Sequence, residues 1–165
     1  MKKLFTRVLP GWFILLFAFA AFTSNAQTTT LIPANSVFKY LDNGSNQGTN
    51  WRLASFNDAT WSQGAAELGF GDSPVTKITS GKLAYYFRKT VSISNPTQYS
   101  SLTLKVRRDD GIVVYVNGTE VYRNNMPTGT IAYNTRASST CSDDGSSVLT
   151  STLANSLFIN GNNVK

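Results

Sequence analysis

The sequence of 165 residues contains no histidine and a single cysteine, and both shortages exclude classes of function. Without histidine there are no histidine-activated serine or cysteine nucleophiles, no histidine general bases and no histidine-ligated zinc. Carboxylate chemistry remains, but a glycosidase needs two carboxylates at a fixed separation across the sugar. Asp109 and Asp110 are adjacent in an extended segment, so their side chains are expected on opposite faces. The sequence therefore favours a protein without catalytic activity of its own.

The single cysteine, Cys141, cannot form a disulfide within the chain. No base or basic cluster lies near it in the sequence to activate the thiol, so we interpret it as an incidental small residue of a polar loop. The charge is also modest, because residues 27–165 carry 12 basic and nine acidic side chains, a net charge of +3. Such a charge lacks the concentrated basic face that nucleic-acid binding requires, and we expect no nucleic-acid partner.

Only one long hydrophobic run occurs, and it lies near the N-terminus. Two lysines and Arg7 precede an apolar run over residues 8–22, and small residues close the segment at Ala26. This order is typical of a secretory signal peptide, and the run is shorter than the roughly 20 residues of a membrane-spanning helix. We predict a signal peptide over residues 1–26 and a secreted or cell-surface protein with no membrane association after cleavage. The alternative, an uncleaved anchoring helix, stays open.

The remaining chain, residues 27–165, is rich in short stretches of alternating apolar and polar residues separated by Gly, Asn, Asp, Ser and Pro. The clearest hairpin joins 112–116 to 119–123 through Asn117-Gly118, because both residues tolerate the positive φ of a type I′ turn. Further strands are predicted at 37–41, 83–93, 102–106, 130–134, 148–153 and 157–159. About eight strands of this spacing predict an all-β fold, a two-sheet antiparallel jelly-roll sandwich.

The predicted strand 83–93 has one apolar face and one face expected in solvent. Its inward residues would be Leu83, Tyr85, Phe87, Val91 and Ile93. The opposite face carries Tyr86 and Arg88, which we expect to point outward. The strand 112–116 is apolar on both faces, so it belongs inside a sheet covered on both sides or beneath a loop.

The C-terminal residues 157–165 turn and begin what resembles another strand. We expect a truncated chain with an incomplete last strand, because a sheet lacking that strand would expose an unpaired edge.

Several segments together resemble galactose-binding-domain-like β-sandwich modules of secreted bacterial multidomain proteins. They are 37–42 (VFKYLD), 51–52 (WR), 56–61 (FNDATW), 64–72 (GAAELGFGD), 85–89 (YYFRK), 108–118 (RDDGIVVYVNG) and 161–164 (GNNV). The chain is also similar to the sugar-binding jelly rolls appended to glycosidases. The resemblance covers nearly all of residues 27–165, and it is more specific for fold than for function.

The resemblance implies a non-catalytic extracellular binding module of a larger bacterial protein, with carbohydrate as its ligand. The alternative is a structural spacer or docking domain of a secreted hydrolase such as a metallophosphoesterase, with no ligand of its own. In either case the C-terminal domains of the same full-length protein are expected partners. A fragment of an enzyme is a third hypothesis.

The candidate ligand-binding residues are Trp51, Asp72, Tyr86, Arg108, Asp109 and Asp110. An exposed aromatic ring can stack on a sugar, while carboxylates accept hydrogen bonds from its hydroxyl groups. Trp51 and Phe70 are candidates for stacking, whereas the spacing of Trp61 after Phe56 favours a core residue.

Calcium is a candidate cofactor, because carboxylates and carbonyls in turns offer it oxygen ligands. Its candidate ligands are Asp109, Asp110, Asp143 and Asp144. The alternative is that Asp109-Asp110-Gly111 is a structural turn held by arginine, and that Asp143-Asp144-Gly145 belongs to a solvated loop.

Overall fold

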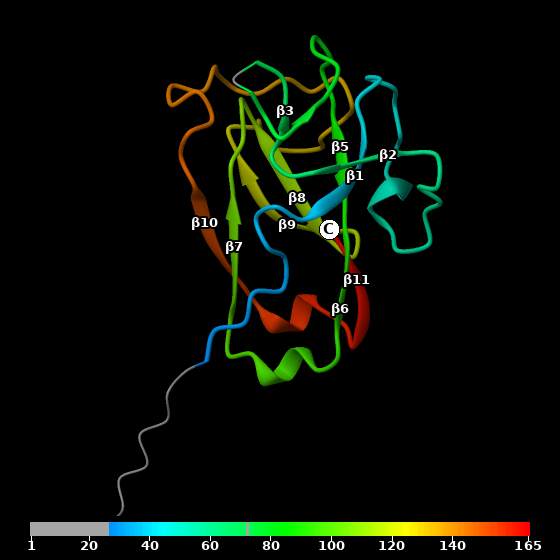
Figure 1. The fold of residues 1–165 in the computed structure, drawn as a ribbon, viewed down its shortest axis with the longest axis vertical. Helices are drawn as coiled ribbons and strands as arrows, with labels where there is room; N and C mark the ends of the chain where they lie inside the picture. Colours follow the sequence, from blue (N-terminus) through cyan, green and yellow to red (C-terminus); the bar gives the residue numbers. More distant parts are fainter. Residues whose placement is uncertain (1–26, 72) are drawn as a thin grey trace, which may run out of the picture.

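The computed structural model describes residues 27–71 and 73–165 (Figure 1). The predicted signal peptide, residues 1–26, and the candidate site residue Asp72 lie outside the described residues. The described chain is all-β, as predicted, since its helices are single short 3-10 turns. None of its helices has the length and apolar character needed to cross a membrane.

The strands are short, and most pair antiparallel. They are β1 Val37–Leu41, β2 Ser62–Ala65, β3 Leu68–Gly69, β4 Thr76–Lys77, β5 Tyr86–Arg88, β6 Thr90–Ile93, β7 Leu102–Val106, β8 Ile112–Val116, β9 Thr119–Asn124, β10 Leu149–Leu153 and β11 Gly161–Val164. The 3-10 turns are η1 Asn50–Arg52, η2 Pro96–Gln98 and η3 Asn155–Leu157. The ladders run β2-β1-β5, β10-β7, β11-β6 and β8-β9, and β3 pairs parallel with β4.

Two sets of backbone hydrogen bonds connect these ladders. Lys89 and Lys165 exchange hydrogen bonds of 2.8 and 2.9 Å, which continues the β6–β11 ladder beyond β11. Asn117 N donates to Val164 O at 3.0 Å, which places the end of β8 on the other side of β11. The strand β11 therefore lies between β6 and β8.

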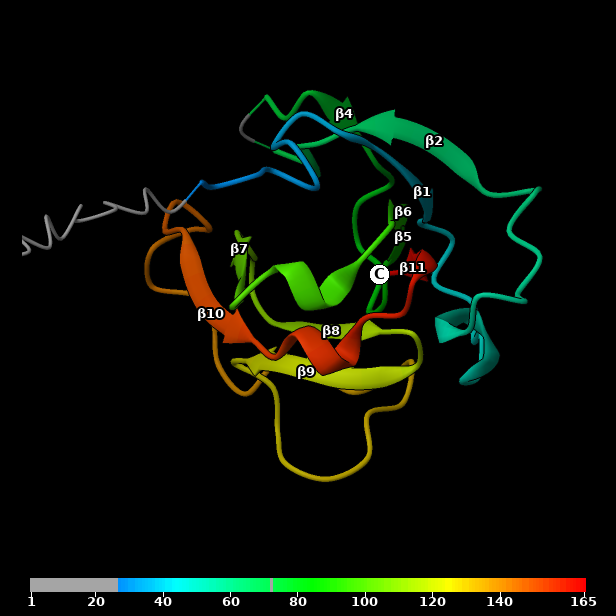
Figure 2. The same ribbon diagram turned by 90° about the horizontal axis from the view of Figure 1, so that it is seen from below.

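The main core contains five buried apolar residues from β6, β7, β8, β10 and the turn after η3. They are Ile93, Leu102, Val116, Leu153 and Phe158. The turns η2 and η3 lie side by side at the lower end of the strands in Figure 1 and face the viewer in Figure 2. Burial of these side chains, each worth roughly 1.5–3 kcal/mol, is the main stabilising contribution at this end.

Local patterns predicted several elements well. The strands β1, β7 and β8 have the predicted bounds, and β9 extends the predicted strand by one residue. Asn117 and Gly118 have φ values of 50° and 87°, as a type I′ turn requires. The strand β8 is also covered on both faces, as its apolar pattern indicates, since Val116 lies in the core while Tyr115 contacts Trp51.

Two predicted strands were wrong. Residues 130–134 form no strand, and Arg123 binds the preceding carbonyls of Pro127 and Gly129 with its guanidinium. Residues 157–159 form no strand either. Leu157 is the last residue of η3, and Phe158 is the C-terminal cap of that 3-10 turn. The apolar residues of both segments alternate as they would in strands, but both segments adopt turns and irregular backbone.

The solvent-facing side of the predicted strand 83–93 is covered, which corrects the expectation for Tyr86 and Arg88. Their side chains are 6% and 4% exposed. Figure 2 shows the segment around η1 outside β1 and β5, on the side away from β7 and β10. This segment places the ring of Trp51 against Tyr86, so the outer face of β5 is shielded from solvent. Leu83 was predicted inward but is 50% exposed and precedes β5.

Candidate functional site at the loop end

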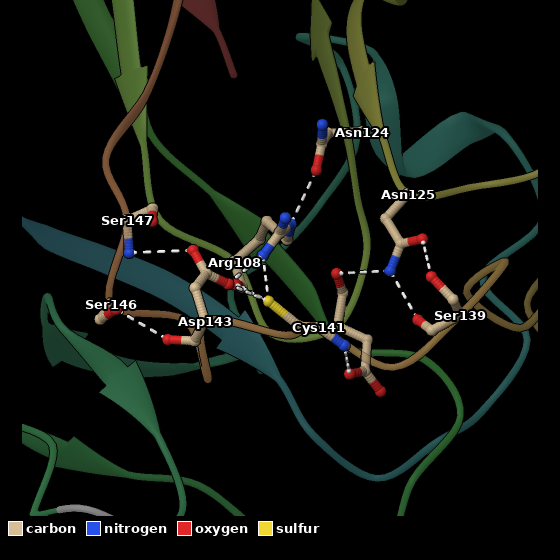
Figure 3. A network of polar contacts seen from close by, with 9 residues as sticks. Arg108, Asn124, Asn125, Ser139, Cys141, Asp143, Ser146 and Ser147 are labelled. Carbon is tan, nitrogen blue, oxygen red and sulfur yellow. Dashed lines mark hydrogen bonds and ion pairs between the residues drawn. The ribbon is translucent and has the colours of Figure 1, made fainter.

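The turn 108–111 and the loop 139–147 pack against each other at the upper end of the molecule (Figures 1 and 3). Arg108 joins them, because its Nε donates to Asn124 Oδ1 at 2.7 Å and its Nη1 to Asp143 Oδ1 at 3.0 Å. The same Nη1 also donates to the sulfur of Cys141. Asp110 Oδ1 accepts from the Cys141 backbone N–H at 2.7 Å. Two segments about 30 residues apart are thus held by charge-assisted hydrogen bonds.

Asp143 is the most strongly bonded carboxylate of the site. It accepts a hydrogen bond from the Cys141 thiol, one from the Ser147 N–H at 3.1 Å and one from Arg108. These three donors, with Cys141 first, hold the pKa of Asp143 well below its usual range. The hydrogen bond to Asp143 in turn raises the pKa of Arg108, so this ion pair stays charged over the accessible pH range.

A second set of contacts fixes the far side of the loop. Asn125 Nδ2 donates to Ser139 O at 2.6 Å and to Asp110 O at 3.2 Å, and Ser139 Oγ donates to Asn125 Oδ1 at 2.9 Å. Gly111 is required beside this contact, because a Cβ there would lie 2.9 Å from the backbone oxygen of Asn125 and 2.5 Å from Met126 Sδ. The loop 139–147, which the sequence suggested to be solvated, is therefore held by hydrogen bonds to the rest of the chain.

The two Asp-Asp-Gly turns that were predicted to bind calcium lie against each other. Partial desolvation, followed by the charges of the nearby Asp110 and Asp144, raises the pKa of Asp109, although the positive charge of Arg108 opposes this shift. A Cβ on Gly145 would lie 3.1 Å from Asp109 Cβ, so the two Asp-Asp-Gly turns touch.

Metal binding by these aspartates stays a prediction. Asp110 and Asp143 already accept hydrogen bonds from the chain, whereas Asp109 and Asp144 are exposed. Within residues 27–71 and 73–165, no group of three or more His, Cys, Asp or Glu side chains is arranged to hold a metal ion.

The remaining predicted site residues lie elsewhere. Trp51 is half-buried on the outer face of the sheet, with its ring edge-on to Tyr86 at 5.0 Å and to Tyr115 at 5.7 Å. Tyr86 is too deeply buried to stack on a sugar. Burial corrects the expectation that Tyr86 binds a ligand, whereas ligand binding by Trp51 stays a prediction.

An ion-pair network holds the segment that carries Trp51. Arg88 donates from Nε to Asp58 Oδ2 at 2.8 Å, and its Nη1 binds the carbonyls of Trp51 and Leu53. Lys39 Nζ donates to the other Asp58 oxygen at 2.7 Å. Desolvation alone would raise the pKa of Asp58, but the hydrogen bonds from Lys39 and Arg88 outweigh it and lower the pKa. The cluster of Lys39, Asp58 and Arg88 therefore holds the segment 51–58 against the sheet.

The aromatic residue at the loop end is Phe70. Its side chain is 51% exposed, and its ring rests against Tyr85 at 5.8 Å between centroids. Glu67, three residues earlier, pairs with Arg107 at 3.5 Å, next to the turn 108–111. Trp61, by contrast, is 6% exposed and packs against Phe56, which confirms the prediction of a core residue.

Sequence reasoning missed the asparagines that support the site, Asn124 and Asn125, and gave Cys141 no partner. Asn125 has a φ of 52°, and asparagine is one of the few residues that tolerate this region. The pair Asn124-Asn125 at the end of a strand was the available signal for a turn. Its partners lie 14 or more residues away, where local patterns give no information.

Two surface grooves, of about 520 and 320 Å³, lie away from this end. The larger is lined by residues of η2 and η3, and the smaller by residues at the start of β1 and the junction of β5 and β6. Comparisons with protein families, with curated proteins and with solved structures found no match for this chain.

Proposed function

We propose that this chain is a non-catalytic, secreted binding module that recognises carbohydrate at its loop end. The observation that carries the proposal is the exposed ring of Phe70, which follows β3 directly and rests against Tyr85. Glu67, just before β3, pairs with Arg107 next to the turn 108–111. An aromatic face beside fixed polar groups is the usual composition of a sugar site. The resemblance to galactose-binding-like jelly rolls supports the same function.

The polar half of the proposed site consists of Asp109 and Asp144, the two exposed carboxylates of the loop end. They would accept hydrogen bonds from sugar hydroxyls, while Arg108 and Asp143 hold the turns in place. Because the loops are already bonded to one another, little ordering entropy is lost on binding. If calcium binds here, Asp109 and Asp144 would be its carboxylate ligands.

A glycan array with the secreted protein, run with calcium and with a chelator, tests this function. We expect signals that Phe70→Ala lowers about five- to thirtyfold, since an aromatic stack and its buried area contribute about 1–2 kcal/mol. Leu83→Ala is the matched control, because Leu83 is exposed to the same extent. Equal losses in the two variants, or no signal on any glycan, would exclude sugar recognition at this end.

A structural spacer is the second candidate, and the placement of the tryptophans favours it. Trp51 and Trp61 both pack on Tyr86. Trp61 is buried and therefore not available for a sugar, and Trp51 is half-buried. The spacer would contact the C-terminal domains of the same protein and bind no ligand of its own. A silent array with and without calcium, from a protein with cooperative unfolding, would support the spacer over the binding module.

A further inference from the structure

Four asparagines of the described chain, all outside the strands, fold their side chains back onto the backbone that follows them. In each, Oδ1 accepts a hydrogen bond from the N–H two residues later at 2.9–3.2 Å, which is the geometry of an Asx turn. They are Asn43, Asn46, Asn57 and Asn95. This turn brings the side-chain carbonyl carbon, Cγ, toward the nitrogen of the next residue, and attack of that nitrogen on Cγ would close a five-membered ring.

The residue that follows each asparagine decides whether this attack is open. Gly44 follows Asn43. Larger residues follow the other three asparagines, namely Gln47, Asp58 and Pro96. The nitrogen of proline has no N–H, so it cannot lose a proton and attack. A side chain on the following residue crowds the approach to Cγ, whereas glycine has none and has the widest choice of backbone angles. Of the four Asx turns, the one at Asn43 therefore has the unhindered nitrogen.

The surroundings of Asn43 also favour the attack. Besides the Ser45 N–H, its Oδ1 accepts a hydrogen bond from Ser45 Oγ at 2.7 Å. Two donors on this oxygen polarise the carbonyl and stabilise the negative charge that forms on it when a nitrogen adds to Cγ. Within residues 27–71 and 73–165, no hydrogen bond engages the Gly44 N–H or Asn43 Nδ2, so neither the attacking nitrogen nor the leaving group is held back. The Asn43 side chain is exposed, so water reaches it.

Asn95 provides a matched comparison within the same chain. Its Oδ1 accepts from Thr97 N at 3.2 Å and from Thr97 Oγ1 at 2.7 Å, which is the same pair of donors as at Asn43. The following residue is Pro96 in place of glycine. The two turns therefore differ in the nitrogen that would attack, and not in the donors that polarise the amide.

The chain has two other Asn-Gly pairs, and its fold protects the first of them, Asn117-Gly118, at the amide. Asn117 Nδ2 donates to Leu157 O at 3.3 Å and to Asn163 Oδ1 at 2.8 Å. Asn117 Oδ1 accepts from Val164 N at 3.0 Å. These three hydrogen bonds hold the amide against β11 and the turn before it, so Cγ cannot turn toward the following nitrogen.

The second pair, Asn160-Gly161, is protected at the nitrogen instead. Gly161 pairs with Ile93 in the ladder of β6 and β11. Lys89 and Lys165 exchange both backbone hydrogen bonds in this ladder, and hydrogen-bonded pairs alternate along an antiparallel ladder. By this alternation Gly161 and Ile93 also exchange both bonds. The Gly161 N–H is therefore bound, and Asn160 can react only when the end of the ladder opens.

We propose that Asn43 is a site of spontaneous deamidation, with water as the only co-reactant. The Gly44 nitrogen loses its proton and bonds to Asn43 Cγ, the Cγ–Nδ2 bond breaks, and the side-chain nitrogen leaves as ammonia with that proton. Water then opens the cyclic imide at either carbonyl, which leaves aspartate or isoaspartate at this position. Each product adds one negative charge beside the Lys82 side chain, whose Cδ lies 3.2 Å from the place of a Cβ on Gly44.

The test follows the three Asn-Gly pairs in the full chain by peptide mapping and mass spectrometry, in buffer and in guanidinium chloride. In the folded protein we expect Asn43 to react at least about tenfold faster than Asn117 and Asn160, whose amide or attacking nitrogen is hydrogen-bonded. In guanidinium chloride the three rates should agree within about threefold, because unfolding removes those contacts. The product at Asn43 should include isoaspartate, which requires the cyclic imide, and Asn95 should give no product.

Ser45→Ala removes one of the two donors to Asn43 Oδ1 and should slow the folded reaction about threefold or more. Gly48→Ala is the control, since it changes the same loop at a positive φ with no atom within 4 Å, and it should leave the rate at Asn43 unchanged. Equal rates at the three pairs in the folded protein, aspartate without isoaspartate, or an unchanged rate in Ser45→Ala would overturn the proposal. So would a reaction at Asn43 that is as slow in buffer as that at Asn117.

Discussion

Replacing Asn163 by alanine should be among the most destabilising single substitutions in this protein. The side chain is 0% exposed, and its amide makes four hydrogen bonds. Oδ1 accepts from Asn117 Nδ2 and from Ile159 N, both at 2.8 Å. Nδ2 donates to Ile159 O at 2.8 Å and to Gly161 O at 3.0 Å. One side chain therefore ties the turn before β11 to the β8–β9 hairpin.

The magnitude follows from what the substitution leaves behind. A satisfied hydrogen bond contributes about 0.5–1.5 kcal/mol net, and a buried partner left unpaired costs about 1–3 kcal/mol. Asn163→Ala removes four bonds in a site without solvent, so we expect the free energy of unfolding to fall by about 3–5 kcal/mol. Asn163→Asp should cost at least as much, because the carboxylate loses both donors and places a charge in a buried site.

Urea unfolding, followed by tryptophan fluorescence, measures this change. With a slope of about 2 kcal/mol per molar urea, the midpoint should fall by about 1.5–2.5 M. Asn162→Ala is the matched control, because the neighbouring Asn162 is exposed and should change stability by less than about 0.5 kcal/mol. A loss below about 1 kcal/mol for Asn163→Ala would refute the reasoning, since water would then be satisfying the partners.

Asp58→Asn should lower the free energy of unfolding by about 2–4 kcal/mol at pH 7, because it leaves Arg88, which is 4% exposed, without its carboxylate. The pKa of Asp58 is lower in the folded state than in the unfolded state, so its contribution to the free energy of unfolding is present above the unfolded pKa of about 3.9 and is lost as pH falls through the folded pKa. The urea midpoints of wild type and variant, measured from pH 7 to pH 2, should therefore converge. A constant difference between them would contradict the pairing. Gly145→Ala should cost about 1–3 kcal/mol by thermal unfolding, because φ is +68° and the new Cβ would lie 3.1 Å from Asp109 Cβ. Gly129→Ala, at φ +82° with no atom within 4 Å, isolates the backbone part, and equal losses would show that the two turns do not touch.

Strand positions were predictable wherever alternation and turn chemistry agreed. The hairpin of β8 and β9 is the clearest case, because Asn117-Gly118 fixes the turn type and the register of the residues next to it; the register then shifts between Tyr115 and Val114, which the turn did not predict. Alternation alone was insufficient at 130–134, where a local turn uses the backbone groups of Ala132: its carbonyl accepts from Thr135 N and its N–H donates to Thr135 Oγ1. Short strands such as β3 and β4, of two residues each, carry no periodic signal.

The covered outer face of β5 shows what a local pattern omits. The alternation placed Tyr86 and Arg88 on the second face, but whether that face is wet depends on the distant segment that holds Trp51. The same limit applies to the candidate site. Both Asp-Asp-Gly turns were recognised as ligand candidates, whereas their contact depends on Arg108 reaching Asp143 across 35 residues of chain.

Arginine connects the loops of this protein to its strands in three separate places. Arg88 binds two carbonyls and a carboxylate of the segment 51–58, Arg108 the loop 139–147, and Arg123 the carbonyls after β9. A planar group with five donors satisfies several loop acceptors at once, which a lysine ammonium cannot do with the same geometry. Each of these arginines is also paired with a carboxylate, Asp58, Asp143 or Glu120, so a count of basic residues overstates the number that the surface can offer to a ligand.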